Sequence, residues 1–178
     1  TGDILFMPYT GKARTQPGTQ QDPLSGYASY YSKDNERALP GYYEVLLKTH
    51  RTKVELTASD RVAFHRYTFP KDVEKHVMIN LKDANGDDRP TDTYLEQIND
   101  TVIRGYRYST GWSKKQQIYF SAVFSQPVHL TLYHDSVQVA GNRLQGLDVK
   151  GNVAVAPVVE ELGVKVGISP VSMENAMD

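Results

Sequence analysis

The chain has 178 residues, a length that fits a single domain and allows a sizeable core without cross-links. Its 20 Lys and Arg nearly balance its 21 Asp and Glu, so the composition gives no electrostatic support for a nucleic-acid partner. The absence of cysteine excludes disulfides, thiolate zinc sites and a cysteine nucleophile, and no apolar run approaches the ~18 residues that span a bilayer.

The first two segments of the chain differ in character. Residues 4–7 form an apolar, strand-like run with no signal peptide before it, so we expect the chain to start inside a larger protein. Residues 11–25 are rich in Gly, Pro, Gln and Thr and nearly free of apolar side chains. This composition predicts an exposed loop.

Short alternating segments dominate from residue 42 onward. Apolar residues with a period of two predict half-buried strands. They occur in five runs: Tyr43, Val45 and Leu47; Val54 and Leu56; Val62 and Phe64; Val77, Ile79 and Leu81; and Ile118, Phe120, Ala122 and Phe124. With turn signals between the runs, the pattern predicts an all-β fold, an antiparallel two-sheet β-sandwich of about ten strands. Residues 91–99 fit a strand or a short helix equally well.

The last seven residues have a different pattern. Ser172 is followed by Met, Glu, Asn, Ala and Met, which is typical of an N-cap and the first turn of a helix. We therefore predict a β-sandwich domain over residues 1–171. Residues 172–178 are expected to start a helix that links it to a further domain.

Two ordered blocks in the first half of the chain are similar to a known family. Residues 36–47 contain Ala-Leu-Pro-Gly-Tyr-Tyr before a strand, and residues 54–70 contain Glu-Leu-Thr-Ala followed by His-Arg-Tyr-Thr-Phe-Pro. Both resemble the N-terminal domain of glycoside hydrolase family 92. Ala63 stands where the family usually has Gly, which is a change of one small residue for another.

Two more blocks in the second half extend the resemblance over nearly the whole chain. Residues 105–127 contain Gly-Tyr-Arg, Gly-Trp, Gln116, Tyr-Phe and Phe-Ser-Gln-Pro in the family's order. Residues 164–176 are similar to the strand and helix start that lead from the family's sandwich into its helical domain. Four ordered blocks make a specific signal, although any one alone is weak.

The resemblance implies an exo-acting, calcium-dependent α-mannosidase. Such an enzyme removes terminal α-linked mannose, with α-1,2 linkages expected, from glycans such as N-glycans, with inversion. In the family, a β-sandwich packs against an (α/α)6 barrel that supplies both catalytic carboxylates and most calcium ligands. The resemblance also implies a periplasmic, cell-surface or secreted protein.

For this chain, the resemblance implies a domain that lacks its Gly- and His-rich first segment and contains no catalytic residue. We expect no bound calcium or other metal, and no activity from residues 1–178 alone. The implied partners are a mannose-containing glycan and the barrel domain of the same protein. The chain has neither a nucleic-acid signal nor a membrane-spanning run.

Four residues in the matched blocks are candidates for substrate binding or for the domain interface: His65, Arg66, Trp112 and Gln116. Arg66 could bond a sugar hydroxyl, or it could pair with an acid on a neighbouring strand. Trp112 could stack on a sugar, or it could cover one end of the sandwich. We also expect several residues of two matched blocks to lie together on an exposed patch near one end or face of the sandwich: Trp112, Tyr106, Tyr108, His65, Arg66 and Tyr67.

The remaining polar residues favour structural roles. The carboxylates beside strands show no spacing that pairs two of them across a site, and residues 85–88 (Asn-Gly-Asp-Asp) fit a turn better than a calcium loop. The five histidines show no zinc-binding spacing. Two alternatives to the enzyme remain: a stand-alone carbohydrate-binding sandwich, and a purely architectural domain.

Overall fold

The fold is nearly all β, as the sequence predicts. A computed structural model describes residues 3–83 and 87–177, and in these residues the chain forms fourteen strands and no α-helix. The strands are β1 (Leu5–Thr10), β2 (Glu36–Leu39), β3 (Tyr42–Leu47), β4 (Thr52–Ala58), β5 (Val62–Thr68), β6 (Lys75–Asn80), β7 (Arg89–Asn99), β8 (Val102–Thr110), β9 (Gln116–Phe124), β10 (Val128–His134), β11 (Val137–Val139), β12 (Arg143–Gly146), β13 (Val149–Val155) and β14 (Glu161–Ser169). Two short 3-10 helices are η1 (Pro23–Ser25) and η2 (Lys33–Asn35).

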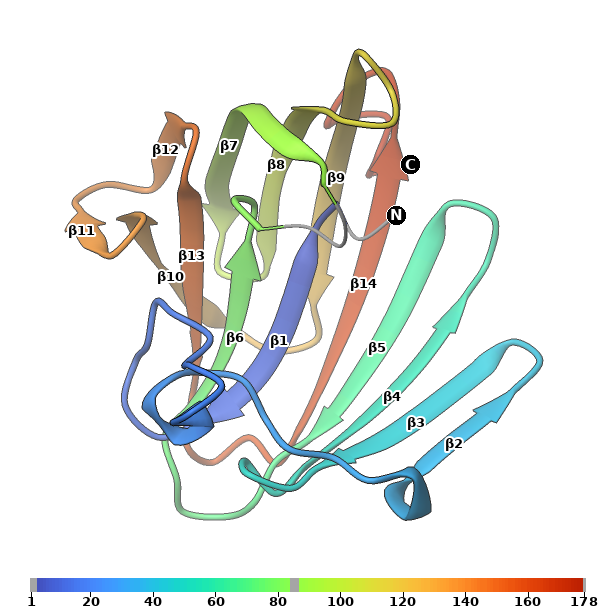
Figure 1. The fold of residues 1–178 in the computed structure, drawn as a ribbon, viewed down its shortest axis with the longest axis vertical. Coiled ribbons are helices and arrows are strands. Elements are labelled where there is room, and N and C mark those ends of the chain that lie inside the picture. The colour runs from blue at the N-terminus through green and yellow to red at the C-terminus, as the bar shows by residue number, and fades with distance from the viewer. Residues whose placement is uncertain (1–2, 84–86, 178) are drawn as a thin grey trace.

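The strands form two antiparallel sheets of unequal width that face each other (Figure 1). The small sheet has the order β1-β6-β13-β10-β11, and the large sheet has the order β12-β7-β8-β9-β14-β5-β4-β3-β2. β1 is therefore an edge strand of the small sheet. In Figure 1 the large sheet extends beyond β1, so that β2–β5 lie to one side of the small sheet.

The core lies between the sheets and is built from the alternating residues. Phe120, Ala122 and Phe124 of β9 are almost completely buried, as are Val77 and Ile79 of β6. A smaller cluster, of Tyr9, Tyr27 and Met78, lies apart from this core. Transfer of this apolar surface from water is the main stabilising term for the fold.

The prediction that Phe64 shares a buried face with Val62 is wrong. Phe64 is 44% exposed, whereas Tyr67, on the opposite face of the same strand, is 1% exposed. Pairing with β14 sets this outcome, because Tyr67 lies opposite the buried Leu162 in the β5–β14 register. The buried side of β5 therefore carries Ala63, His65 and Tyr67, and its outer side carries Phe64 and Arg66.

Three local expectations also have outcomes in the structure. Residues 91–99 belong to strand β7, and no helix forms there. Residues 11–22 form a largely exposed irregular loop, followed by the 3-10 helix at Pro23–Ser25. The turn expected at residues 85–88 includes two residues outside the described part of the chain.

The C-terminal segment, residues 171–177, folds back over the outer face of the large sheet. The Ser121 hydroxyl donates to the Met173 carbonyl at 2.8 Å, and Arg104 Nη1 lies 2.9 Å from Glu174 Oε1. Ser172 Oγ accepts a hydrogen bond from the Asn175 amide at 3.1 Å, which is the contact of an N-cap. The described residues of this segment form a turn, and the linker helix stays a prediction.

Candidate functional site

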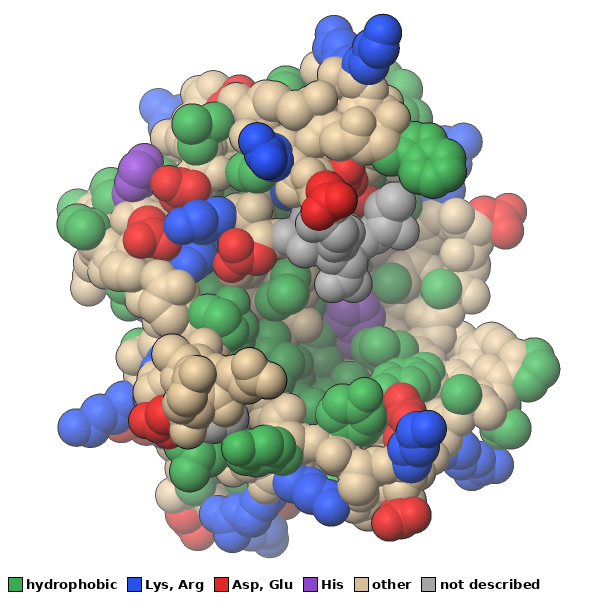
Figure 2. All heavy atoms as spheres, viewed as in Figure 1, with side chains coloured by type: hydrophobic (Ala, Val, Ile, Leu, Met, Phe, Trp, Pro, Cys, Tyr) green, Lys and Arg blue, Asp and Glu red, His purple; other side chains and the backbone are tan. Residues whose placement is uncertain are grey.

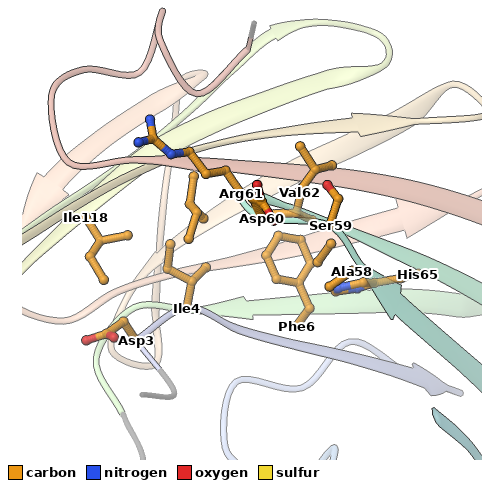
Figure 3. A pocket seen from close by; sticks show the side chains of 13 residues that line it. Asp3, Ile4, Phe6, Ala58, Ser59, Asp60, Arg61, Val62, His65 and Ile118 are labelled. Carbon is orange, nitrogen blue, oxygen red and sulfur yellow. The ribbon is translucent and has the colours of Figure 1, made fainter. Parts of the chain in front are cut away.

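An open groove separates strand β1 from the hairpin of β4 and β5. Its cavity volume is about 270 Å³, which is just below the ~300–1,000 Å³ of typical small-molecule pockets. Figure 2 shows the groove as a hollow with hydrophobic side chains and a histidine inside it. Figure 3 shows Ile4 and Phe6 on one side of this groove, with Val62 and Ser59 on the other. The remaining lining residues are Asp3, Ala58, Asp60, Arg61, Ala63, His65, Ile118, Val166 and Ile168.

His65 lies in this groove on the buried side of β5. Its ring meets the Phe6 ring edge-on at 5.6 Å, and its Nδ1 is 2.7 Å from the Tyr67 hydroxyl. Burial lowers the pKa of His65 to about 4, so the imidazole is neutral near pH 7. A neutral ring already bonded to a buried tyrosine contributes mainly to the groove wall.

Arg66 projects from the opposite face of the same strand. Its Nε and Nη2 donate to the two carboxylate oxygens of Glu55 on β4, at 2.8 and 2.7 Å. Arg66 and Tyr42, which donates at 2.7 Å, lower the pKa of Glu55 to about 2. Glu55 on the neighbouring strand therefore already binds two nitrogens of the Arg66 guanidinium.

Gln116 belongs to a buried polar cluster at the end of the groove. Its Nε2 donates to Asp3 Oδ1 at 2.6 Å, and Arg107 Nη1 lies 3.1 Å from the same oxygen. Arg107 is fully buried, and its Nε donates to the Leu81 carbonyl at 3.0 Å. A buried charge needs such partners, so the cluster holds β1, β8 and β9 together at this end.

Trp112 lies in the turn between β8 and β9 and is 99% exposed. Its backbone amide donates to Asp88 Oδ1 at 3.3 Å. A side chain at Gly111 would place its Cβ 1.8 Å from the same Asp88 oxygen, which explains why glycine precedes the tryptophan. The Asp88 carbonyl accepts a hydrogen bond from Arg107 Nη2 at 3.4 Å. Asp88 therefore connects this turn to the cluster that contains Gln116.

The structure therefore associates three of the four candidates with the groove or with the buried cluster at its end, and separates the fourth. His65 lines the groove, Gln116 bonds Asp3 of the same groove, and Trp112 is connected to that cluster through Asp88. Arg66 faces the other way.

The expected patch does not combine the two blocks: Tyr106 and Tyr108 stack on each other, but His65, Arg66 and Tyr67 do not join them. Tyr67 is buried, and Arg66 lies on β5 with β14 and β9 between it and the tyrosines of β8. The strand period turns His65 and Tyr67 to the opposite side of the sheet from Arg66, and the strand order keeps Arg66 away from the tyrosines of β8.

A tyrosine cluster on the outer face of β7, β8 and β9 was not predicted. Tyr106 stacks on Tyr94 and Tyr108, with ring centroids 5.5 and 4.4 Å apart, and the Tyr108 and Tyr119 hydroxyls are 2.5 Å apart. Because the rings stack on one another, few of their faces remain free to stack on a sugar. The only sequence signal is that Tyr106 and Tyr108 share a strand face.

Acidic residues in the described part of the chain do not form a metal site. No group of three or more His, Asp or Glu residues there has the geometry to hold a metal ion. Glu44 and Glu55 lie close together, but both accept the Tyr42 hydroxyl, and each is paired with a cation. This neutralised pair does not fit calcium, which takes six to eight oxygen ligands.

Comparison with known proteins gives the family. The model of the glycosyl hydrolase family 92 N-terminal domain matches residues 1–169. No curated protein matches the chain.

Solved structures of that family share the fold. A family GH92 α-mannosidase from Bacteroides thetaiotaomicron, in complex with mannoimidazole, superposes with a TM-score of 0.93 at 33% identity over 99% of this chain. A GH92 family glycosyl hydrolase has a TM-score of 0.81 at 24% identity over 98% of the chain. A family GH92 inverting mannosidase from Bacteroides thetaiotaomicron VPI-5482 has a TM-score of 0.78 at 19% identity over 98% of the chain.

The chain spans about a quarter of the length of these structures: 24% of the first, 24% of the second and 22% of the third. With the family model matching 169 of its residues and a 33% identical α-mannosidase covering nearly all of it, the chain belongs to glycosyl hydrolase family 92, as its N-terminal domain.

Proposed function

We propose that residues 1–178 are one structural part of an enzyme that removes terminal α-linked mannose from glycans, with α-1,2 linkages expected and with inversion. The observation that carries this proposal is the 33% identity to an α-mannosidase in complex with mannoimidazole. Inversion is supported by the fold neighbour described as an inverting mannosidase. The localisation in this proposal, which the family resemblance supports, is the periplasm, the cell surface or outside the cell.

We also propose that residues 1–178 alone are inactive. Inverting hydrolysis needs a protonated carboxyl and a carboxylate ~6.5–9.5 Å apart. Glu44 and Glu55 accept hydrogen bonds from one shared hydroxyl, which places the bonded oxygens closer together than that range. With a pKa of about 2, Glu55 holds no proton to donate near neutral pH. In this proposal the acid, the base and the calcium site belong to other parts of the enzyme.

The contribution of this domain, in the same proposal, is to contact the catalytic domain with the end that carries Trp112 and Gln116. A fully exposed tryptophan connected through Asp88 to a buried polar cluster suits an interface anchor. Arg66 is left out of this role, because Glu55 occupies its guanidinium.

Hydrolysis of an aryl α-mannoside tests the proposal. The full-length protein should turn over the substrate and lose activity with a calcium chelator, and NMR should show the inverted anomer first. Residues 1–178 should show no turnover with or without calcium. Turnover by residues 1–178 that disappears on substitution of one of their own Glu or Asp residues would overturn the proposal.

The exposed Trp112 side chain favours a second candidate function, a stand-alone carbohydrate-binding sandwich. Trp112 is the only tryptophan, so its fluorescence is a clean probe. Titration of residues 1–178 with mannose should leave the emission unchanged if the first proposal holds. A saturable change in the emission would favour the binding module. That change should be kept in Phe64→Ala, which alters an exposed side chain on β5 and not the β8–β9 turn that carries Trp112.

A further inference from the structure

The backbone groups at the free edge of β1 are bonded at one end of the strand and open at the other. The Gly11 amide donates to the Glu74 carbonyl at 3.0 Å and continues the β1–β6 ladder, so odd-numbered residues direct their backbone groups to β6. Even-numbered residues face the other edge, and the Thr10 amide there donates to His50 Nδ1 at 3.3 Å. Pro8 is also on this side, where its missing N–H costs no bond to β6.

The part of this edge around Phe6 is open. β1 has β6 as its one strand neighbour among the described residues, and Phe6 directs its backbone N–H and C=O toward the groove edge. An edge strand with unpaired backbone groups is a template for a further strand. Pro8 and the Thr10–His50 bond restrict that template to the part of β1 around Phe6.

The groove beside this edge has the shape and chemistry of a site for an extended peptide. Ala58 and Ala63 lie opposite each other on β4 and β5, and these small side chains leave room above the sheet. The other walls are mostly apolar, with Phe6, Ile118 and Ile168 among them. The polar lining residues are either already bonded or at the exposed rim. Asp3 is bonded to Gln116 and Arg107, and His65 is bonded to Tyr67, while Ser59, Asp60 and Arg61 lie in the exposed turn between β4 and β5.

We propose that a β-strand from the same polypeptide, outside residues 1–178, adds to the edge of β1 at Phe6 and fills this groove. Its alternate side chains are apolar and pack on Ala58, Ala63 and His65, and it widens the small sheet over β5 and β4. The length of the relatives supports an occupant in cis, because this chain covers 24% of the 33% identical α-mannosidase. In this proposal the groove is where the domain binds another segment of the same polypeptide.

Amide hydrogen exchange at Phe6 tests this strand addition. In the full-length protein the Phe6 amide should exchange at least ~100-fold more slowly than in residues 1–178, because exchange would require the added strand to open. The substitution Ala63→Arg, which fills the groove, should remove that protection in the full-length protein. Phe64→Arg, on the same strand but facing outward, is the matched control and should keep it.

Equal exchange of the Phe6 amide in both proteins would overturn the proposal. Protection in residues 1–178 that rises with protein concentration would also overturn it, because the occupant would then be a second copy. If Ala63→Arg prevents folding, the comparison of the unsubstituted full-length protein with unsubstituted residues 1–178 still tests the proposal. Exchange is measured without substrate, so a failure of the proposed mannosidase activity would leave this result unaffected.

Discussion

Arg66 on β5 forms a bidentate ion pair with the Glu55 carboxylate on β4, with nitrogen–oxygen distances of 2.8 and 2.7 Å. The Glu55 side chain is 10% exposed, whereas that of Arg66 is 54% exposed. Lys53 lies 3.6 Å from the same carboxylate, and Tyr42 donates to it. The pair is therefore a structural link between strands in the matched Glu-Leu-Thr-Ala and His-Arg-Tyr blocks.

Stability should fall at acidic pH through Glu55. The pKa of Glu55 drops from an ordinary value of 4.5 to about 2 in the folded protein, so its contribution is present above about pH 4.5 and is lost as pH falls toward 2. Glu55→Gln should lower the unfolding free energy at pH 7 by about 1 kcal/mol, since one partner is half exposed. Urea unfolding at pH 7, 4 and 3 measures this.

The control for Glu55 is Glu160→Gln, because Glu160 and its partner Lys71 are both more than half exposed. That substitution should change the unfolding free energy by less than ~0.5 kcal/mol. Equal effects of the two substitutions at pH 7 would contradict a structural role for the Arg66–Glu55 pair.

His65 should produce a second pH dependence, at higher pH. Burial lowers the pKa of His65 from 6.5 to about 4, so the unfolded chain binds a proton between these values while the folded protein does not. Stability is therefore lost as pH falls from 6.5 toward 4, with a slope of up to about 1.4 kcal/mol per pH unit.

The substitution His65→Leu isolates this contribution. Leu suits the apolar groove, and the variant should show a flatter dependence of the unfolding free energy on pH between 6.5 and 4. Some slope will remain, because burial also lowers the pKa values of His50 and His76. Identical slopes for the variant and the wild type would show that His65 titrates normally.

Gly105 should be intolerant of any side chain. A Cβ at this position would lie 2.1 Å from the Tyr94 carbonyl oxygen and 3.0 Å from the Phe120 ring, and the carbonyl belongs to the paired strand backbone. Gly105→Ala should therefore cost ~2–3 kcal/mol of stability. Gly163→Ala, where the nearest atoms of Ser125 are at 3.5 Å, is the matched control, and thermal unfolding compares the two.

Removal of the Arg107 side chain should be among the most damaging substitutions. Arg107→Ala leaves the buried Asp3 carboxylate without its cation, which costs ~3–5 kcal/mol when one partner of a buried pair is removed. Arg104→Ala, which breaks partly exposed pairs with Glu96 and Glu174, should cost less than ~1 kcal/mol. Denaturant titration measures both, and Asp3→Asn in the Arg107→Ala background should restore part of the loss.

The fold was predictable because alternation and turn residues act locally. The run Ile118, Phe120, Ala122 and Phe124 predicts the strand β9 and its buried face, and three of its four members are indeed buried. Alternation does not identify the inner face when both faces carry apolar groups. On β5 that is the case, and pairing with β14 makes Tyr67 rather than Phe64 the buried residue.

The candidate site was predictable only in part, because its contacts join distant segments. Gln116 meets Asp3 across 113 positions of sequence, and no local pattern announces that bond. The tyrosine cluster depends on the register between β7, β8 and β9, which places Tyr94 opposite Tyr106 and Tyr106 opposite Tyr119. Composition reveals the tyrosines, but only the register reveals that they stack.

The position of β13 in the small sheet sets an order for folding during synthesis. β6 lies between β1 and β13, and all six of its residues are buried in the finished domain. At ~5–20 residues per second on the ribosome, β1 and β6 must wait several seconds for residues 149–155 to emerge. During that interval an apolar strand has one free edge, which is a hazard for aggregation. The meander β2–β5, whose pairings are local, can form in the meantime. Nascent chains stalled before residue 149 should therefore protect β3–β5 from proteolysis while leaving β6 open to cleavage.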